Sequence, residues 1–187
     1  MELSFATGNR NKVKEASAVL ERFGISINQS PLRKIEIQSG DLVEIVEYAL
    51  SHLCMEANNL VVEDDGLFVN SLNGFPGPYA AYAYSTIGVR GLLKLMQGVA
   101  GEERRATFKS VVGACVGGRR FIVEGAVDGV ITEEPRGSSG FGFDPVFSPL
   151  GGGRTFAEMS IEEKSRYSHR ALAFSRLAER LLKEGAL

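Results

Sequence analysis

The sequence lacks the features that direct a protein to a membrane or out of the cell. It has no charged start followed by an apolar run, as a signal peptide has, and no apolar run long enough to span a bilayer. Its net charge is only −2, so no overall basic field attracts nucleic acid. We therefore expect a cytoplasmic protein that binds neither membranes nor nucleic acid.

Cysteine is scarce as well. The two cysteines, Cys54 and Cys115, have no CxxC or zinc-ligand spacing. Cysteines of a protein in a reducing compartment remain thiols. The sequence therefore predicts two buried thiols rather than a disulfide.

Common nucleotide-binding motifs, internal repeats, low-complexity tracts and linkers are also missing. Neither GxxxxGK[ST] nor GxGxxG occurs in the chain. The 187 residues are 44% hydrophobic, which is enough for a sizeable core. We expect a single domain covering residues 1–187.

The elements that are present predict an α/β fold. A strand at residues 3–7 precedes a helix whose apolar spacing begins at Val13 and ends at Gly24. Residues 25–30 and 33–38 resemble either a strand pair or one strand with a break, and Asp41 with Glu44 has the spacing of a capping box. Residues 59–69 form an apolar run that three acids and a glycine interrupt. Further segments predict a helix at 86–99, a hairpin turning near residues 117–118, and a C-terminal helix broken near residue 168. Helices and strands that alternate early in the chain, followed by a hairpin, imply a mixed sheet.

The stretch "TGNRNK", residues 7–12, turns from a strand into a helix through Gly8. A helix start presents backbone N–H groups to anions, and Lys12 places a cation where the helix dipole disfavours one. Either an anion binds there, or Lys12 is a surface lysine on a helix capped by Asn9 or Asn11.

Three adjacent acids, Glu63, Asp64 and Asp65, end an apolar strand. Strand alternation places Glu63 and Asp65 on one side and Asp64 on the other. Mutual repulsion of these carboxylates is relieved if a hard cation such as Mg²⁺ binds there, and Glu36 is a candidate partner ligand. The alternative is a polar strand end before the turn at Gly66.

Two further segments carry candidate ligand contacts. In "SSGFGFDPVF", residues 138–147, glycines between Phe141 and Phe143 allow an aromatic face to approach a flat ligand. In "EEKSRYSHRA", residues 162–171, Ser168 is a good N-cap, which places two cations in the first turn of a helix. Two cationic helix starts beside an acidic strand end suggest a nucleoside polyphosphate bound with a metal.

Four ordered segments give the chain a specific resemblance. "TGNRNKVKE", "VEDDGLFVNSLNGFPGPYA", "FGFDPVF" and "MSIEEKSRYSHRALA" resemble the motifs of the inosine/xanthosine triphosphate pyrophosphatases, the Ham1-like family. The "EIQ" before an acidic helix cap resembles its archaeal branch. The resemblance implies a long twisted mixed sheet flanked by helices, with two lobes around a central cleft. It also implies Mg²⁺-dependent, or Mn²⁺-dependent, hydrolysis of ITP, dITP and XTP to the monophosphate and pyrophosphate by a homodimer.

The resemblance also assigns roles to residues. Asp64 matches the catalytic base, and Glu36 and Asp64 match the metal ligands. The matching substrate contacts are Thr7, Gly8, Asn9, Arg10, Asn11, Lys12, Asp65, Phe141, Gly142, Phe143, Asp144, Lys164, His169 and Arg170. Either Phe141 or Phe143 would stack on the base.

Two positions depart from the family pattern. Asp65 stands where the family has Ser or Thr, and a carboxylate repels a phosphate to which a hydroxyl would donate. Participation in metal binding is the alternative role for Asp65. Tyr48 stands where many members have a lysine, so positive charge near the phosphates is either missing or supplied by another residue.

Two rival functions remain open. One is a Maf-like pyrophosphatase acting on modified pyrimidine nucleotides. The other is a non-catalytic nucleotide sensor, which would bind the same ligand without releasing pyrophosphate. A Nudix hydrolase is disfavoured because its long Glu-rich signature is absent.

Overall fold

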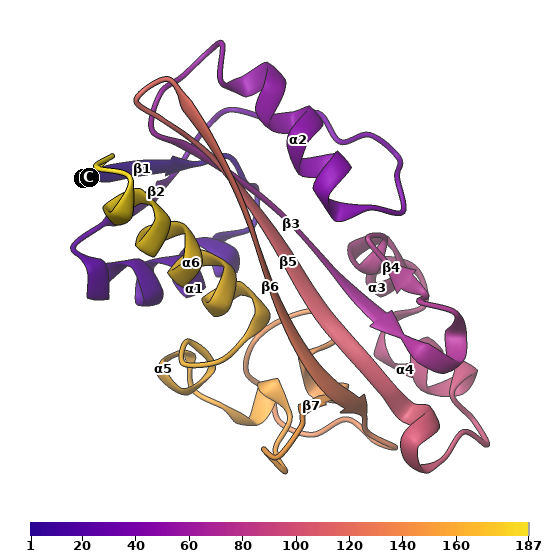
Figure 1. Cartoon of the computed structure of the whole chain (residues 1–187). Coiled ribbons are helices and arrows are strands. Elements are labelled where there is room, and N and C mark those ends of the chain that lie inside the picture. The colour runs from indigo at the N-terminus through magenta and orange to yellow at the C-terminus, as the bar shows by residue number, and fades with distance from the viewer. Residues whose placement is uncertain (187) are drawn as a thin grey trace.

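The computed structural model describes residues 1–186 and contains a seven-stranded mixed sheet with the order β2-β1-β3-β5-β6-β7 (Figure 1). The short strand β4 pairs with β3 beside this path. Strands β1, β2 and β3 run parallel, and the remaining pairs are antiparallel. The strands are β1 Glu2–Phe5, β2 Ser26–Gln29, β3 Leu60–Val69, β4 Pro76–Gly77, β5 Arg105–Val116, β6 Arg119–Ile131 and β7 Phe147–Pro149. This arrangement confirms the predicted mixed α/β fold.

Three long strands, β3, β5 and β6, cross the whole molecule (Figure 1). The predicted hairpin between β5 and β6 is confirmed. Its two turn residues, Gly117 and Gly118, have φ values of 58° and 73°. Two consecutive positive φ angles fit the twist of a tight hairpin, and glycine adopts them without strain.

Helices cover both faces of the sheet (Figure 1). Alternate residues of β5 divide between two cores: Val112 packs with α1 and α6, whereas Val111 packs with α2. This is the period of two that a strand buried on both faces requires. The helices are α1 Arg10–Leu20, α2 Leu42–Leu53, α3 Ala80–Thr86, α4 Gly88–Leu95, α5 Ile161–Lys164 and α6 His169–Lys183. None of the helices in residues 1–186 is long and apolar enough to cross a membrane.

A third core lies at the other end of the long strands, where α3, α4 and β7 gather (Figure 1). Part of this region was not anticipated, because residues 70–80 include β4 and lead into α3. The predicted helix at residues 86–99 is shorter and ends at Leu95. The proposal of one domain with two lobes stays a prediction.

Gly125 on β6 shows how closely α6 approaches the sheet. A Cβ atom built there would lie 2.2 Å from the carbonyl oxygen of His169 and 2.5 Å from the amide nitrogen of Ala173. Only glycine permits this approach. The contact fixes the start of α6, and with it the functional residues of that turn, against the sheet.

The prediction of a strand at residues 33–38 is wrong. Strand β1 has β2 on one side and β3 on the other, and residues 33–38 form an irregular segment. The alternating apolar residues misled the prediction, since Ile35 is 55% exposed. The capping box predicted at Asp41 is half formed: Asp41 accepts a hydrogen bond from Val43 N, but Glu44 accepts one from the Ser39 hydroxyl.

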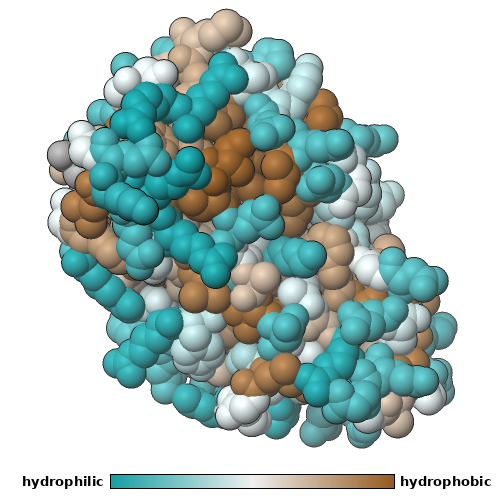
Figure 2. Space-filling view, viewed as in Figure 1, coloured by the Kyte–Doolittle hydropathy of each residue, from teal (hydrophilic) through white to brown (hydrophobic). Residues whose placement is uncertain are grey.

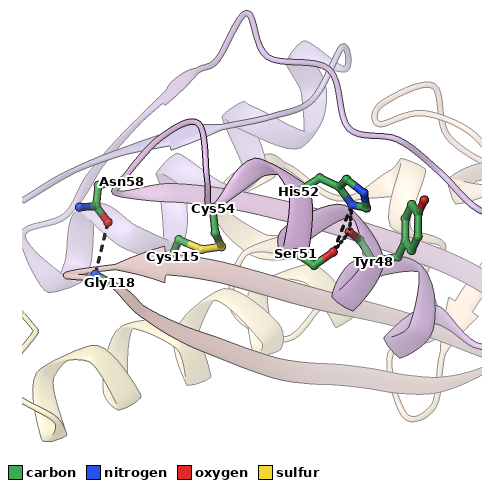
Figure 3. The surroundings of a disulfide bond; sticks show 7 residues. All are labelled: Tyr48, Ser51, His52, Cys54, Asn58, Cys115 and Gly118. Carbon is green, nitrogen blue, oxygen red and sulfur yellow. Dashed lines mark hydrogen bonds between the residues drawn. A yellow bond between two sulfur atoms is a disulfide. The ribbon is translucent and has the colours of Figure 1, made fainter.

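The prediction of two free thiols is also wrong, because a disulfide joins Cys54 to Cys115 (Figure 3). Their Cα atoms lie 5.8 Å apart, within the usual range for a disulfide. Cys54 follows α2 and Cys115 lies near the end of β5. The two residues are 61 positions apart, so only the packing of α2 on the sheet reveals the pair.

Candidate active site

A cavity of about 1150 Å³ opens beside the end of β1 and the middle of β3. Its lining comes from the start of α1, the irregular segment after β2, the acids of β3, the start of α3, the loop at residues 141–144 and the start of α6. Most residues assigned by resemblance line it. They are Thr7, Gly8, Asn9, Lys12, Glu36, Asp64, Asp65, Phe141, Gly142, Phe143, Asp144, His169 and Arg170.

Three of the assigned residues do not line this cavity. Arg10 and Asn11 are exposed on the first turn of α1. Lys164 is buried behind the cavity wall, where it is bound by carboxylates. Lys14, also on the first turns of α1, is exposed.

The start of α1 forms as predicted. The Asn9 side chain accepts a hydrogen bond from Asn11 N at 2.9 Å, and Thr7 Oγ1 accepts one from Asn9 N at 3.1 Å. These two caps fix the turn so that Lys12 faces the acids of β3. Lys12 Nζ lies 2.9 Å from Glu63 Oε2 and also contacts Asp65.

The predicted alternation of the β3 acids is confirmed, but the prediction that they end the strand is wrong, because β3 continues through Gly66 to Val69. Glu63 and Asp65 both contact Lys12 and Arg170, whereas Asp64 contacts Lys34. The two sides therefore have different partners. Glu63 and Asp65 hold two cations on one side of β3, whereas Asp64 faces the ammonium group of Lys34 on the other.

The start of α6 carries the second cation. Ser168 caps the helix by accepting a hydrogen bond from Ala171 N at 3.1 Å. Arg170 is fully buried, and its guanidinium donates to Glu15 at 2.6 Å and to Glu63 at 2.8 Å. A buried guanidinium held at two nitrogens has a fixed direction.

Sequence reasoning missed Glu15, which bridges the two cations of the C-terminal segment. One carboxylate oxygen accepts from Lys164 at 2.7 Å and the other from Arg170 at 2.6 Å. Glu15 lies three residues after Lys12, on the same face of α1, and this spacing was the available signal. Burial raises the pKa of Glu15, but the charges of Arg170 and Lys164 outweigh burial and lower this pKa to about 2.

Burial and charge shift the pKa values of the β3 acids in different directions. Burial raises the pKa of Asp64, and the nearby Lys34 offsets this only in part. Burial acts in the same direction on Asp65, but Lys12 and Arg170 outweigh it and hold the pKa of Asp65 well below its ordinary value. Asp65 is thus firmly ionised, whereas Asp64 is the better proton acceptor of the two.

Sequence reasoning also missed Lys34, which lies between the two assigned metal ligands. Its Nζ atom lies 2.9 Å from Glu36 Oε1 and 3.0 Å from Asp64 Oδ1, and it donates to the Glu63 carbonyl at 2.8 Å. Two carboxylates and a carbonyl around one cation are a donor set that suits Mg²⁺. The residues therefore fit a divalent metal, provided that Lys34 moves away.

Protein ligands alone would leave such a metal incompletely coordinated. Within residues 1–186, no cluster of three or more His, Cys, Asp or Glu side chains could hold a metal ion. Mg²⁺ is usually bound through one or two carboxylates, with waters and substrate phosphates completing the coordination. The pair Glu36 and Asp64 matches that pattern.

The loop at residues 141–144 is held by Asp144. Its Oδ2 atom accepts hydrogen bonds from Phe141 N at 2.9 Å and from Lys164 at 2.7 Å. Phe143 is only 2% exposed and packs edge-on against Tyr84, whereas Phe141 is half-buried at the cavity. Of the two rings, Phe141 is therefore the one that a ligand can reach.

His169 brings polar atoms to the same region. Its ring stacks on Phe108, with centroids 4.6 Å apart and planes 8° apart. Neither ring nitrogen has a hydrogen-bond partner in the described part of the chain, although the ring is buried. Buried polar atoms are normally paired, so a ligand is the expected partner. Burial lowers the pKa of His169, which favours the neutral ring.

Tyr48, which stands where many family members have a lysine, lies away from this cavity. It belongs to α2, where its ring packs on His52 (Figure 3). It also lines a separate hollow of about 830 Å³. Figure 2 shows apolar side chains gathered over the hairpin strands between α2 and α6, framed by hydrophilic ones. Lys34 lines the main cavity instead and supplies positive charge there.

Comparisons with known proteins find relatives that match nearly the whole chain. Residues 3–180 match the sequence profile of the Ham1 family. A dITP/XTP pyrophosphatase of Methanopyrus kandleri is 49% identical over 96% of this chain and 95% of its own length. One of Pyrobaculum aerophilum is 47% identical over 95% and 94%. The solved Staphylococcus aureus Ham1 protein has a TM-score of 0.81 at 26% identity, covering 98% of this chain and 100% of that one. The chain belongs to the Ham1 family.

Proposed function

We propose that this chain hydrolyses non-canonical purine nucleoside triphosphates, namely dITP, ITP and XTP, to the monophosphate and pyrophosphate. Two relatives that each match about 95% of the chain bear the name dITP/XTP pyrophosphatase. The observation that carries the proposal is a single cavity lined by two cationic helix starts, a carboxylate pair and an aromatic loop. These features match a polyphosphate, a divalent metal and a base.

The proposed metal ligands are Glu36 and Asp64. A bound Mg²⁺ or Mn²⁺ would neutralise phosphate charge and make a coordinated water more acidic. Glu36 is 59% exposed at its side chain, so it can turn towards an incoming metal–nucleotide complex without disturbing the core. Lys34 would then leave the carboxylates and remain near the phosphates.

The proposed base is also Asp64. It takes a proton from the water that attacks the α-phosphorus, and pyrophosphate leaves. Phosphoryl transfer depends mainly on positioning and on neutralising charge. Buried carboxylates hold Lys12 and Arg170 in place, so the two positive charges are already oriented before the substrate arrives.

Base selection is assigned to His169 and the loop at residues 141–144. A 6-keto purine accepts a hydrogen bond where adenine donates one. The unpaired ring of His169 offers an N–H donor, and Phe141 offers a face on which the base can stack. A buried donor left unpaired by adenine would reject it strongly.

A pyrophosphate-release assay tests the proposal directly. The panel contains ITP, dITP, XTP, ATP, dUTP and methylated UTP, each with and without Mg²⁺. Preferred release from the 6-keto purines, dependent on Mg²⁺, supports the proposal. Preferred release from the pyrimidines supports the Maf-like alternative, and binding of ITP without any release supports the nucleotide sensor.

We also propose that the chain forms a homodimer through the surface around α3. Tyr79, Tyr82 and Tyr84 are exposed there, Tyr82 by 71%. Exposed aromatic clusters of this kind mark interaction surfaces. Sedimentation of the wild type and of Tyr82→Ser tests this, because the variant should weaken a dimer and leave a monomer unchanged. Cytoplasmic location stays a prediction from the sequence.

A further inference from the structure

Asp65 contacts Lys12 and Arg170, the two cations that the proposed function assigns to phosphate. Its Oδ1 atom contacts Lys12 Nζ, and its Oδ2 atom lies 3.2 Å from Arg170 Nη2 and 3.9 Å from His169 Nε2. One carboxylate thus faces both Lys12 of α1 and Arg170 of α6, the two cations assigned to phosphate. A phosphate bound to the same groups would have to take its place.

The two cations do not need Asp65 for neutralisation. Glu63, whose side chain is fully buried, already contacts both Lys12 and Arg170. Glu15 provides Arg170 with a second carboxylate at 2.6 Å. Asp65 is therefore an additional anion, and it lines the cavity with 17% of its side chain exposed.

The contact between Asp65 and Arg170 is not a good hydrogen bond. Although the two groups lie 3.2 Å apart, Arg170 Nη2 has no hydrogen-bond partner in the part of the chain that the structure describes. A buried guanidinium donor without a well-directed acceptor is costly. It remains available for an anion that approaches from a better direction.

We propose that Asp65 is an internal competitor for substrate phosphate, which lowers the affinity of the site for polyphosphate. This inference rests on the proposed function, because it takes the cavity to be a polyphosphate site. In the free protein this additional carboxylate contacts both Lys12 and Arg170 and lies between them. When a polyphosphate binds, Asp65 loses these contacts and repels the incoming anion.

The proposal predicts that one substitution lowers the stability of the free protein and strengthens its binding of pyrophosphate. Asp65→Ser removes an anion that stabilises the free protein, so the free protein should unfold at a lower temperature. The same change leaves both cations available to phosphate, so binding of pyrophosphate should become tighter by about tenfold or more. A residue that merely supports the fold would lower both stability and binding.

The experiment measures pyrophosphate binding by calorimetry without divalent metal, and thermal unfolding without ligand. Asp65→Asn is the second variant, since it removes the charge and keeps the size. Asp128→Ser is the matched control, because it removes an exposed carboxylate on β6 outside the cavity. Tighter binding in either Asp65 variant, with the control unchanged, supports the proposal.

Equal or weaker pyrophosphate binding by both folded Asp65 variants would overturn it. The proposed function fails separately, if the wild-type protein releases no pyrophosphate from ITP, dITP or XTP in the presence of Mg²⁺. Wild-type hydrolysis without tighter binding in the variants therefore refutes the role of Asp65 alone.

Discussion

The ammonium group of Lys34 lies 3.0 Å from a carboxylate oxygen of Asp64, at the position that the proposed metal would share with Glu36. Two cations cannot both occupy this position. Lys34 would therefore compete with the proposed metal for the same two carboxylates.

Replacing this lysine should favour the metal. In Lys34→Met, the Mg²⁺ concentration that gives half-maximal pyrophosphate release should fall by several-fold, because no side chain has to be displaced. Lys14→Met is the control, since Lys14 is exposed on α1. An unchanged or higher Mg²⁺ requirement in Lys34→Met would show that Lys34 does not compete with the metal.

Glu15 should make stability depend on acid pH. Burial raises its pKa, but Arg170 and Lys164 outweigh burial and lower it from 4.5 to about 2. A carboxyl group with a depressed folded pKa adds stability that is complete above its unfolded pKa and lost as the pH falls towards the folded value. Between pH 4.5 and pH 2 the free energy of unfolding should lose about 3 kcal/mol from this group.

Denaturant unfolding at a series of pH values measures this dependence. Glu15→Gln should be less stable at neutral pH, because it leaves Lys164 and Arg170 short of a carboxylate, and its stability should vary less between pH 4.5 and pH 2. Glu47→Gln, at an exposed position of α2, serves as the control. A Glu15 variant with the wild-type slope would contradict the depressed pKa.

The disulfide should contribute to stability without being part of the site. It closes a loop of 61 residues, for which the loop-entropy estimate is about 4 kcal/mol. Reductant should therefore lower the melting temperature of the wild type by several degrees and leave that of Cys115→Ser unchanged. Neither cysteine lines the cavity, so ITP hydrolysis at moderate temperature should continue. Identical melting with and without reductant would rule out a stabilising bond.

The two phenylalanines of the loop should respond differently to truncation. Phe141 is half-buried at the cavity, so Phe141→Ala should raise KM for ITP with little loss of stability. Phe143 is 2% exposed in the core beside Tyr84, so Phe143→Ala should cost about 3 kcal/mol or more of stability. Steady-state kinetics and thermal unfolding of both variants separate the roles. The reverse pattern would assign base stacking to Phe143.

Local patterns were sufficient for several parts of the fold and site. Ser168 caps its helix as predicted, and Asn9 is the cap of the two predicted candidates, Asn9 and Asn11, because a cap depends on a few neighbouring residues. The acids of β3 alternate as predicted, because a period of two follows from the strand itself. Helix caps and strand alternation depend on neighbouring residues, so they can be predicted from the sequence.

The missed features depend on distant segments. Cys54 meets Cys115 because α2 packs on β5, and Lys34 meets Asp64 because an irregular segment lies along the cavity. Glu15 meets Arg170 across 155 positions of the chain. Nothing in the immediate neighbourhood of these residues specifies their partners, so the contacts appear only in the folded structure.

Asp64 carries the central claim, since it is proposed both as a metal ligand and as the base. The decisive measurement is the rate of pyrophosphate release from ITP by the wild type and by Asp64→Asn at saturating Mg²⁺. The account predicts release by the wild type and a loss of about 100-fold or more in the variant, which keeps its shape but cannot accept the proton. Near-normal release by Asp64→Asn would contradict the account.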